Sequence, residues 1–488
     1  MKIVDLSKFC VVLGSGLNGT VVANELLRGQ QKVVMIDAGL TEKDRATQTE
    51  VNIIKKKFTS PKFWLENKTH TYAKFTDWAG PKEKNFSAIG SLAQGGLSNL
   101  WAGDIKPYNS DELKNFVYGE QEIKSIAGEI SSLLTGNTLS KSNNPKFKNS
   151  LVNYLSAPSK HLNDIKVTEP RNAVVLHKKS ESLAHKSSEN VVFNAKMELL
   201  RLIKNKNFFY KQGFLIEDIS RHKDYYIIQA RKTDSASKVL FKVKTIFCSL
   251  GVINTTKLVL RMENRFNKKL QLLNTPSASF ILFNFKKNFE NQKTLTIENI
   301  HSLASYTIKV HDNYISGNIF PAPVDLLAKY PISKMINNWT GKKLNELILP
   351  KIFLCNINFP SIYSNNSIFL NEKGNLEITA EKPLNSLEKD YLLTRKKLSL
   401  FFRSKGFFTF PIFNKLLKAG EDIHYGGTLP MSKKPGELEC DSLGRLYGHE
   451  SFYLTDPSSM SFLAGKGHTF NSMVQSTLIV QKYLKRIN

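Results

Sequence analysis

Two histidines near the end of the chain are the residues whose types and spacing most directly suggest chemistry. His424 opens the sequence His-Tyr-Gly-Gly-Thr, and His468 opens His-Thr-Phe-Asn. An imidazole exchanges protons near neutral pH, so two of them beside glycine-containing loops suggest acid–base catalysis. The chain holds ten histidines, and a purely structural role is the competing interpretation for each.

His468 stands at the start of a helix predicted over 468–486, directly after Gly465 and Gly467. A helix start carries N–H groups without helical acceptors and a partial positive charge. Such an end stabilises a developing anion. It also lowers the pKa of a nearby histidine, which keeps the ring neutral and able to accept a proton.

The elements of a dinucleotide-binding unit lie at the opposite end of the chain. Residues 8–13 form a short apolar run typical of a buried strand, and residues 20–28 have helical spacing. A second apolar run over 32–37 ends in Asp37. A strand, a glycine turn, a helix and a strand that ends in an acid are the context in which a glycine fingerprint is informative.

The glycines of this fingerprint are Gly14, Gly16 and Gly19. The first permits a tight turn, the second lets the backbone approach a pyrophosphate, and the third lets helix and strand pack closely. Asp37 lies where a carboxylate meets the ribose hydroxyls. The pattern does not separate NAD from FAD, and a glycine turn in another α/β protein remains the alternative.

The rest of the chain is less patterned. Strand-like segments cover 191–250 and run into a helix predicted over 254–261, which indicates that the chain returns to a doubly wound sheet. Residues 41–87 are polar and irregular, and residues 106–190 are rich in Lys, Ser and Asn. Residues 270–420 mix patterns typical of strands with patterns typical of helices.

Length and composition indicate a folded protein of two or three domains. The chain has 488 residues, of which 41% are hydrophobic and 23% charged. The net charge of +27 is spread along the chain without a nucleic-acid-binding signature, so no nucleic-acid partner is expected. The four cysteines lack metal-ligand spacing, so no metal site is expected. With no secretory signal visible, a cytoplasmic location is predicted.

Taken together, these residues resemble the glucose–methanol–choline (GMC) oxidoreductase family. The resemblance rests on blocks that follow the family's order along the chain: 14–37, 95–101, 247–258, and the tail from His424 onward. It implies an α/β fold with an FAD-binding Rossmann-like domain and a discontinuous α+β substrate-binding domain.

The resemblance assigns domain boundaries. It implies that 1–105, 191–265 and 421–488 form the FAD-binding domain, that 106–190 is an insertion or cap, and that 266–420 binds the substrate.

The resemblance also implies that FAD is the cofactor. The cofactor-binding residues that it implies are Gly14, Gly16 and Gly19 at the pyrophosphate, Asp37 at the adenosine ribose, Ile216 beside the adenine, Gly95, Gly96 and Asn99 toward the flavin, Asp456 at the ribityl–pyrophosphate region, and the backbone N–H groups of Thr469 and Phe470 at the flavin's pyrimidine edge.

The implied reaction is the oxidation of a CH–OH group of an alcohol, a sugar or a lipid-linked sugar, with hydride transfer to flavin N5. His424 corresponds to the family's main catalytic histidine and would take the hydroxyl proton, while His468 would position the substrate oxygen. The electron acceptor that reoxidises the flavin is not indicated. The resemblance extends to bacterial GMC-like proteins of polysaccharide or lipid pathways. Two alternatives stay open: a different flavin enzyme, and a redox-silent flavoprotein that binds a polysaccharide or lipid intermediate.

One segment suggests a membrane surface. Residues 396–418 mix phenylalanines with Lys and Arg, a composition that can lie in a bilayer interface. Peripheral membrane contact is therefore a hypothesis. The alternative is a core helix and strand whose lysines extend toward solvent.

Overall fold

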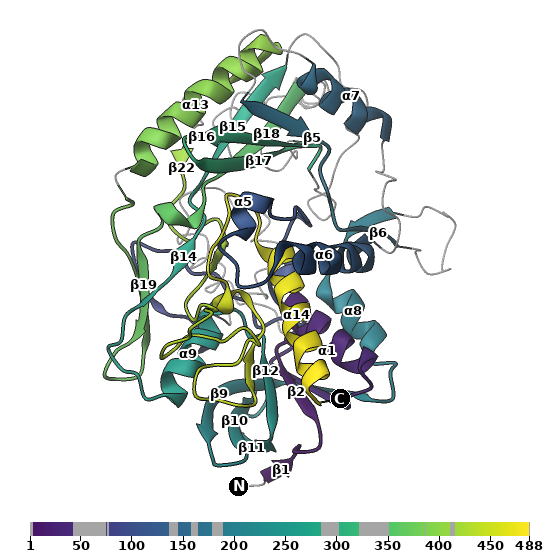
Figure 1. Ribbon diagram of the computed structural model, residues 1–488, viewed down its shortest axis with the longest axis vertical. Coiled ribbons are helices and arrows are strands. Elements are labelled where there is room, and N and C mark those ends of the chain that lie inside the picture. Colours follow the sequence, from purple (N-terminus) through teal and green to yellow (C-terminus); the bar gives the residue numbers. More distant parts are fainter. Residues whose placement is uncertain are drawn as a thin grey trace, which may run out of the picture.

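The computed structural model describes residues 3–41, 75, 78–135, 145–157, 164–177, 189–284, 302–321, 351–384, 386–409 and 415–487. These residues form two bodies, one above the other in Figure 1, and both ends of the chain lie in the lower one.

A five-stranded parallel sheet forms the centre of the lower body. Its strand order is β24–β12–β2–β3–β8, and every neighbouring pair is parallel. The strands are β24 (Phe452–Leu454), β12 (Thr245–Cys248), β2 (Cys10–Leu13), β3 (Val33–Asp37) and β8 (Phe208–Gln212). The apolar runs Cys-Val-Val-Leu and Val-Val-Met-Ile are buried along their whole length because a parallel sheet is covered on both faces.

Helices pack beside this sheet and bring the two ends of the chain together. Helix α1 lies against α14, α6 packs on α14, and α8 packs on α1 (Figure 1). Their bounds are α1 (Leu17–Arg28), α6 (Glu120–Thr135), α8 (Ala195–Leu202) and α14 (Thr469–Ile487). The last helix of the chain is therefore part of the same core as the first.

A second, smaller sheet completes the lower body. Strands β9, β10 and β11 form an antiparallel meander, and β1 joins β11 in parallel. The elements are β1 (Ile3–Asp5), β9 (Phe214–Arg221), β10 (Tyr226–Lys232), β11 (Lys238–Val243) and α9 (Val252–Met262), which packs on β9.

A seven-stranded antiparallel sheet forms the upper body, in the order β21–β15–β18–β17–β16–β5, with β22 beside β15. The strands are β5 (Ile165–Thr168), β15 (Ser277–Asn284), β16 (Ala304–Val310), β17 (Asn313–Pro321), β18 (Ile352–Asn358), β21 (Phe407–Thr409) and β22 (Lys415–Leu416). Helices α13 (Ser386–Ser404) and α7 (Pro145–Ser156) pack on this sheet (Figure 1). The body has its own core of large side chains, including Tyr306, Phe353 and Phe402.

The remaining strands are short, and β19 and β20 contribute side chains to the core of the lower body. One sheet has the order β13–β19–β20–β4, and two strand pairs are β14–β23 and β6–β7. The bounds are β4 (Lys82–Lys84), β6 (Val174–His177), β7 (Glu189–Val192), β13 (Leu270–Gln271), β14 (Leu273–Asn274), β19 (Asn366–Leu370), β20 (Leu376–Ala380) and β23 (Tyr425–Gly426). The remaining helical turns are α5 (Ser110–Leu113), η2 (Gly96–Asn99), η5 (Ser361–Tyr363) and η7 (Pro457–Ser459).

The predicted fold class is confirmed: a parallel sheet with helices, built from discontinuous stretches of chain, carries a second body with an antiparallel sheet. The residues of 106–190 that the structure describes are shared between the two bodies, because α6 packs on α14 while β5 joins the upper sheet. The domain boundaries themselves stay a prediction.

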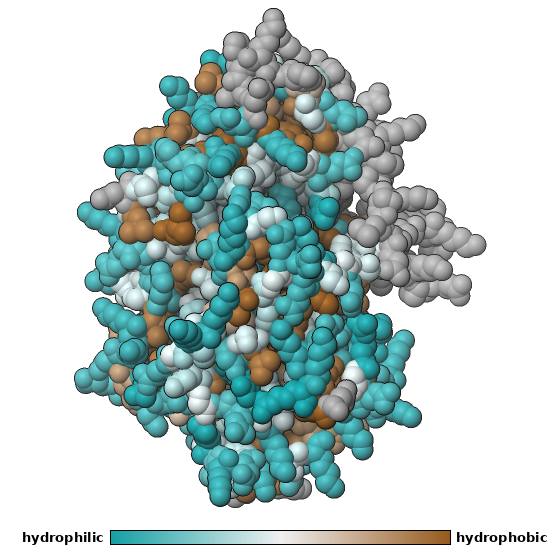
Figure 2. All heavy atoms as spheres, viewed as in Figure 1, coloured by the Kyte–Doolittle hydropathy of each residue, from teal (hydrophilic) through white to brown (hydrophobic). Residues whose placement is uncertain are grey.

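The described part of 396–418 packs against the upper sheet. Phe401, Phe402 and Phe407 are buried in the upper core, and the ammonium group of Lys397 donates to Asp164 at 2.9 Å. Residues 410–414 lie outside the described residues. Figure 2 shows hydrophilic side chains over most of the visible face, with apolar ones in small separate groups. This packing favours the core interpretation, and membrane contact stays a hypothesis.

Across the described residues, every helix falls short of the length and apolar character that crossing a bilayer requires.

Candidate active site

A cavity of about 540 Å³ lies between the two bodies, within the size range of small-molecule and cofactor sites. Loops at the ends of the parallel strands line it on one side. Strands β15, β17 and β18 of the upper sheet line it on the other. Both candidate histidines and most of the predicted cofactor residues lie on its wall. In α/β folds this edge of the sheet is where ligands bind.

The three fingerprint glycines have different surroundings. A β-carbon on Gly14 would lie 2.5 Å from the carbonyl oxygen of Ser249, and Gly14 has a φ of +95°. A β-carbon on Gly19 would lie 2.0 Å from the carbonyl oxygen of Gly14. At Gly16 it would meet no atom of the described residues within 4 Å. Gly14 and Gly19 therefore permit the turn and the close packing, whereas Gly16 leaves open space facing the cavity.

The open space at Gly16 coincides with a helix start. Gly16 is the N-cap of α1 and provides no side-chain cap, so the first N–H groups of the helix retain donor capacity toward the cavity. A β-carbon on Gly96, in the second glycine block, would lie 3.4 Å from the α-carbon of Gly16. The two glycine blocks thus form one cradle that has the shape and donor groups for a phosphate.

Asp37 lies at the end of β3 and lines the cavity. The hydroxyl groups of Ser15 and Tyr210 both donate to its Oδ2 atom, the latter at 3.0 Å. Burial raises the pKa of Asp37 to about 6, and the two hydroxyl donors oppose that rise. The group is therefore largely ionised at neutral pH and can accept hydrogen bonds from ribose hydroxyls.

The predicted residues of the second glycine block mainly order their own loop. The backbone N–H of Gly95 donates to the Ser15 hydroxyl at 3.0 Å, which ties this loop to the first. Asn99 lines the cavity, and its amide donates to the carbonyl oxygen of Gly96 at 2.8 Å. Asn194 donates to Asn99 at 2.9 Å. Gly95 itself is not on the cavity wall.

Asp456 also lines the cavity, but described groups already bind both of its oxygens. The backbone N–H of Gly251 and the hydroxyl of Thr255 donate to Oδ2 at 2.9 and 2.5 Å, and the N–H of Ser458 donates to Oδ1 at 2.9 Å. Burial raises the pKa of Asp456. The carboxylate thus joins the start of α9 to η7, beside the cofactor side of the cavity.

The other predicted cofactor residues divide into two groups. Ile216, on β9, and Thr469, the first residue of α14, line the cavity. Phe470 is a buried core residue whose side chain is not on the cavity wall, and Gly19 is likewise behind it. The interpretation of Phe470 concerns its backbone N–H, which belongs to the first turn of α14, where N–H groups have no acceptor within the helix.

His424 and His468 lie side by side on the cavity wall. Their ring centroids are 5.4 Å apart and the rings are nearly perpendicular, at 88°. Burial, together with the neighbouring His424, lowers the pKa of His468 to about 3. The sequence predicted this direction from the helix start, whereas the structure attributes it mainly to burial. His468 therefore stays neutral at physiological pH.

The segment before His424 carries backbone strain. Ile423 has a φ of +64°, a region that β-branched residues rarely occupy and that costs about 1–3 kcal/mol. Two contacts hold the segment: the backbone N–H of Thr275 donates to the carbonyl oxygen of His424 at 3.1 Å, and the N–H of Ile89 donates to the Tyr425 hydroxyl at 2.9 Å. Strain of this kind is typical of functional positions.

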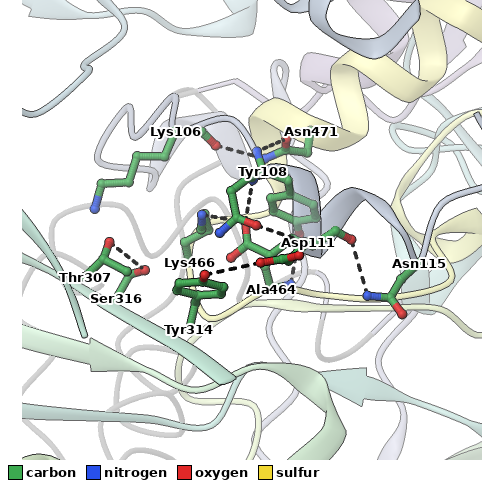
Figure 3. Close-up of polar contacts among 12 residues, drawn as sticks. Lys106, Tyr108, Asp111, Asn115, Thr307, Tyr314, Ser316, Ala464, Lys466 and Asn471 are labelled. Carbon is green, nitrogen blue, oxygen red and sulfur yellow. Dashed lines mark hydrogen bonds and ion pairs between the residues drawn. The ribbon is translucent and has the colours of Figure 1, made fainter. Parts of the chain in front are cut away.

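A polar clamp holds the loop that carries His468. The ammonium group of Lys466 donates to buried Glu112 at 2.7 Å. Asn471, on the first turn of α14, accepts from the backbone N–H of Tyr108 and donates to the carbonyl oxygen of Lys106, both at 3.0 Å. Figure 3 shows Tyr108 and Asn471 facing each other, with Lys466 beside them. The segment leading into α5 thereby fixes the start of α14.

Sequence reasoning missed several cavity residues. Ser15 lies inside the glycine fingerprint, and Asp104 follows five residues after Asn99, so a closer reading of those blocks could have found both. Asn318 and Asn356, on β17 and β18, come from the middle of the chain. No motif there marks them.

The comparisons with known proteins bear on the fold. No family model matches the chain, and no curated protein matches it. Among solved structures, the crystal structure of pyridoxine 4-oxidase from Mesorbium loti matches with a TM-score of 0.60 at 12% identity, over 97% of this chain and 99% of that one. The likeness covers both bodies and shows a GMC oxidoreductase fold, without showing membership of the family by sequence.

Proposed function

We propose that the protein is an FAD-dependent oxidoreductase that acts on a CH–OH group. One observation carries the proposal: a single cavity joins a glycine cradle with an open face at Gly16 to a pair of perpendicular histidine rings. The fold shared with pyridoxine 4-oxidase, which by its name oxidises pyridoxine, supports the same class of reaction.

The residues on the cavity wall fit FAD. Gly16, Gly96 and the start of α1 would hold the pyrophosphate, and Asp37 would accept from the adenosine ribose hydroxyls. Ile216 would lie beside the adenine. The first turn of α14, at Thr469, offers N–H donors and a partial positive charge to the flavin side.

Bound FAD would supply the hydride acceptor, and the protein would supply proton transfer and positioning. We assign the base to His424. A general base works best when its pKa lies near the operating pH, and the pKa of about 3 at His468 is too low for that role. His468, which stays neutral, would hold the substrate hydroxyl by a hydrogen bond. The division of labour follows from the different environments of two similar rings.

The visible spectrum of the purified protein tests the proposal. We expect a yellow protein, or one that FAD reconstitutes, that bleaches when an alcohol is added without oxygen. Candidate substrates include neutral sugars, simple alcohols and pyridoxine. A colourless protein that FAD does not reconstitute would contradict the cofactor assignment. A yellow protein that no alcohol bleaches would favour a redox-silent flavoprotein.

A further inference from the structure

A carboxylate that the proposed function does not use lies beside the histidines. Asp104 lines the cavity. Its Oδ2 atom lies 3.8 Å from the point where a β-carbon on Gly467 would sit, and the Nε2 atom of His424 lies 4.0 Å from the same point. The carboxylate and the candidate base therefore border the same small space.

An ordered hydrogen-bond array holds Asp104. The ammonium group of Lys106 donates to Oδ1 of Asn318 at 2.7 Å, and the hydroxyl of Ser305 donates to the same atom at 2.7 Å. Since an ammonium group can only donate, the oxygen of the Asn318 amide must face Lys106, and its Nδ2 group must face away from Lys106. That group donates to Oδ2 of Asp104 at 3.1 Å. Asp104 is thereby set as a hydrogen-bond acceptor.

The acceptor capacity of Asp104 is largely unused. A carboxylate has about four lone-pair sites, and the described residues donate one side-chain hydrogen bond to this one. Its Oδ1 atom is buried without a hydrogen-bond partner among the described residues. A ligand hydroxyl can use the remaining acceptor capacity of Oδ2, which borders the space beside His424.

The charges around the array disfavour an anionic ligand. Lys106 is half-buried. Burial lowers the pKa of its ammonium group, and the charge of nearby Asp104 opposes that shift. In the part of the chain that the structure describes, no Lys or Arg lines the cavity, although the chain as a whole carries a net charge of +27. An anionic group would therefore meet carboxylates and no cation on the wall, whereas a neutral hydroxyl group can donate to Asp104.

We propose that Asp104 determines specificity by accepting a hydrogen bond from a second hydroxyl of the substrate, so that the substrate is a neutral polyol or sugar rather than a monohydric, phosphorylated or carboxylated alcohol. The inference rests on the proposed function, since the hydroxyl to be oxidised is the one beside His424. Lys106 acts as a positioning residue, because it is not on the cavity wall and acts on Asp104 through Asn318.

The test compares anaerobic flavin reduction by matched probes. FAD-loaded wild-type protein is mixed with a panel of neutral hexoses and hexitols, and with hexanol, cyclohexanol, anionic gluconate and cationic aminohexanol. For each probe we compare the ratio of the limiting reduction rate to the dissociation constant. We expect this ratio to be about tenfold or more higher for at least one neutral polyol than for any monohydric or charged probe. A monohydric or charged probe that performs as well would overturn the inference.

The variant Asp104→Asn keeps the shape but changes the acceptor. We expect the preference for the polyol over hexanol to fall by about tenfold or more, mainly because the dissociation constant of the polyol rises. The matched control is Asp111→Asn, which alters an exposed carboxylate bonded to Tyr314 and Lys114 outside the cavity. An unchanged preference in Asp104→Asn, with the control also unchanged, would refute the assignment.

Equilibrium binding separates this inference from the proposed function. If no probe bleaches the flavin, the proposed reaction fails. Thermal stabilisation by the same probes still measures binding. Neutral polyols that stabilise the wild type but not Asp104→Asn would sustain the role of Asp104, whereas polyols that stabilise no better than hexanol would overturn it. If Asp104→Asn does not fold, the comparison of probes on the wild type decides alone.

Discussion

Substitution by alanine should have a different outcome at each of three glycines, Gly16, Gly19 and Gly128. At Gly16, alanine would add a methyl group that meets no atom within 4 Å in the part of the chain that the structure describes, so folding should be unaffected. In the bound state that methyl would occupy the space through which the backbone approaches the pyrophosphate. Gly16→Ala should therefore give a folded protein that has lost FAD.

The magnitude follows from the contacts at risk. If the methyl displaces the phosphate from two N–H donors, each charge-assisted hydrogen bond is worth about 1.5–3 kcal/mol. The loss of roughly 3–6 kcal/mol corresponds to more than about 100-fold in the FAD dissociation constant.

Two other alanines serve as controls. Gly128, on α6, also has no atom within 4 Å of a β-carbon and is outside the cavity, so Gly128→Ala should keep FAD and gain about 0.5–1 kcal/mol of stability. Gly19→Ala would place its methyl 2.0 Å from the carbonyl oxygen of Gly14 and should destabilise the fold itself. FAD titration and thermal melting of the three variants distinguish these outcomes. A Gly16→Ala protein with wild-type FAD affinity would show that the pyrophosphate does not approach the backbone at Gly16.

Three further substitutions test the site. FAD retention in the wild type should fall as the pH drops through about 6, since the ionised form of Asp37 is the acceptor; Asp37→Asn should remove that step, and gel filtration across pH measures it. Gly467→Ala adds a methyl near His424 without close contacts and should raise KM about tenfold or more at an unchanged melting temperature; an unchanged KM would place the substrate elsewhere. Lys466→Met breaks a buried ion pair and should lower the free energy of unfolding, measured with denaturant, by about 3–5 kcal/mol. Adding Glu112→Gln should restore part of this stability, and additive losses in the double variant would contradict the ion pair.

The cofactor side of the site was predictable from the sequence because its determinants are local. The buried runs of β2 and β3 and the spacing of Gly14, Gly16 and Gly19 lie within one short unit, and the physics of a tight turn fixes their roles. The predicted helices over 20–28, 254–261 and 468–486 correspond to α1, α9 and α14 with small shifts of their ends.

The substrate side was not predictable because long-range pairing assembles it. Asp104 and Asn318 are 214 residues apart in sequence, and their contact depends on the register of β17 in an antiparallel sheet. That sheet is built from strands such as Ser277–Asn284, which are buried along most of their length and lack a clear alternation. Neither side chain stands in a motif, so only the fold brings them to the histidines.

The role of His424 is the centre of this account, and anaerobic single-turnover reduction of the FAD-loaded protein measures it directly. With the best substrate of the panel, His424→Ala should slow reduction by about 100-fold or more, because it removes the base. His468→Asn should slow it less, because Asn keeps a hydrogen-bonding group. A rate in His424→Ala within a few-fold of the wild type, or a larger loss at His468, would contradict the account.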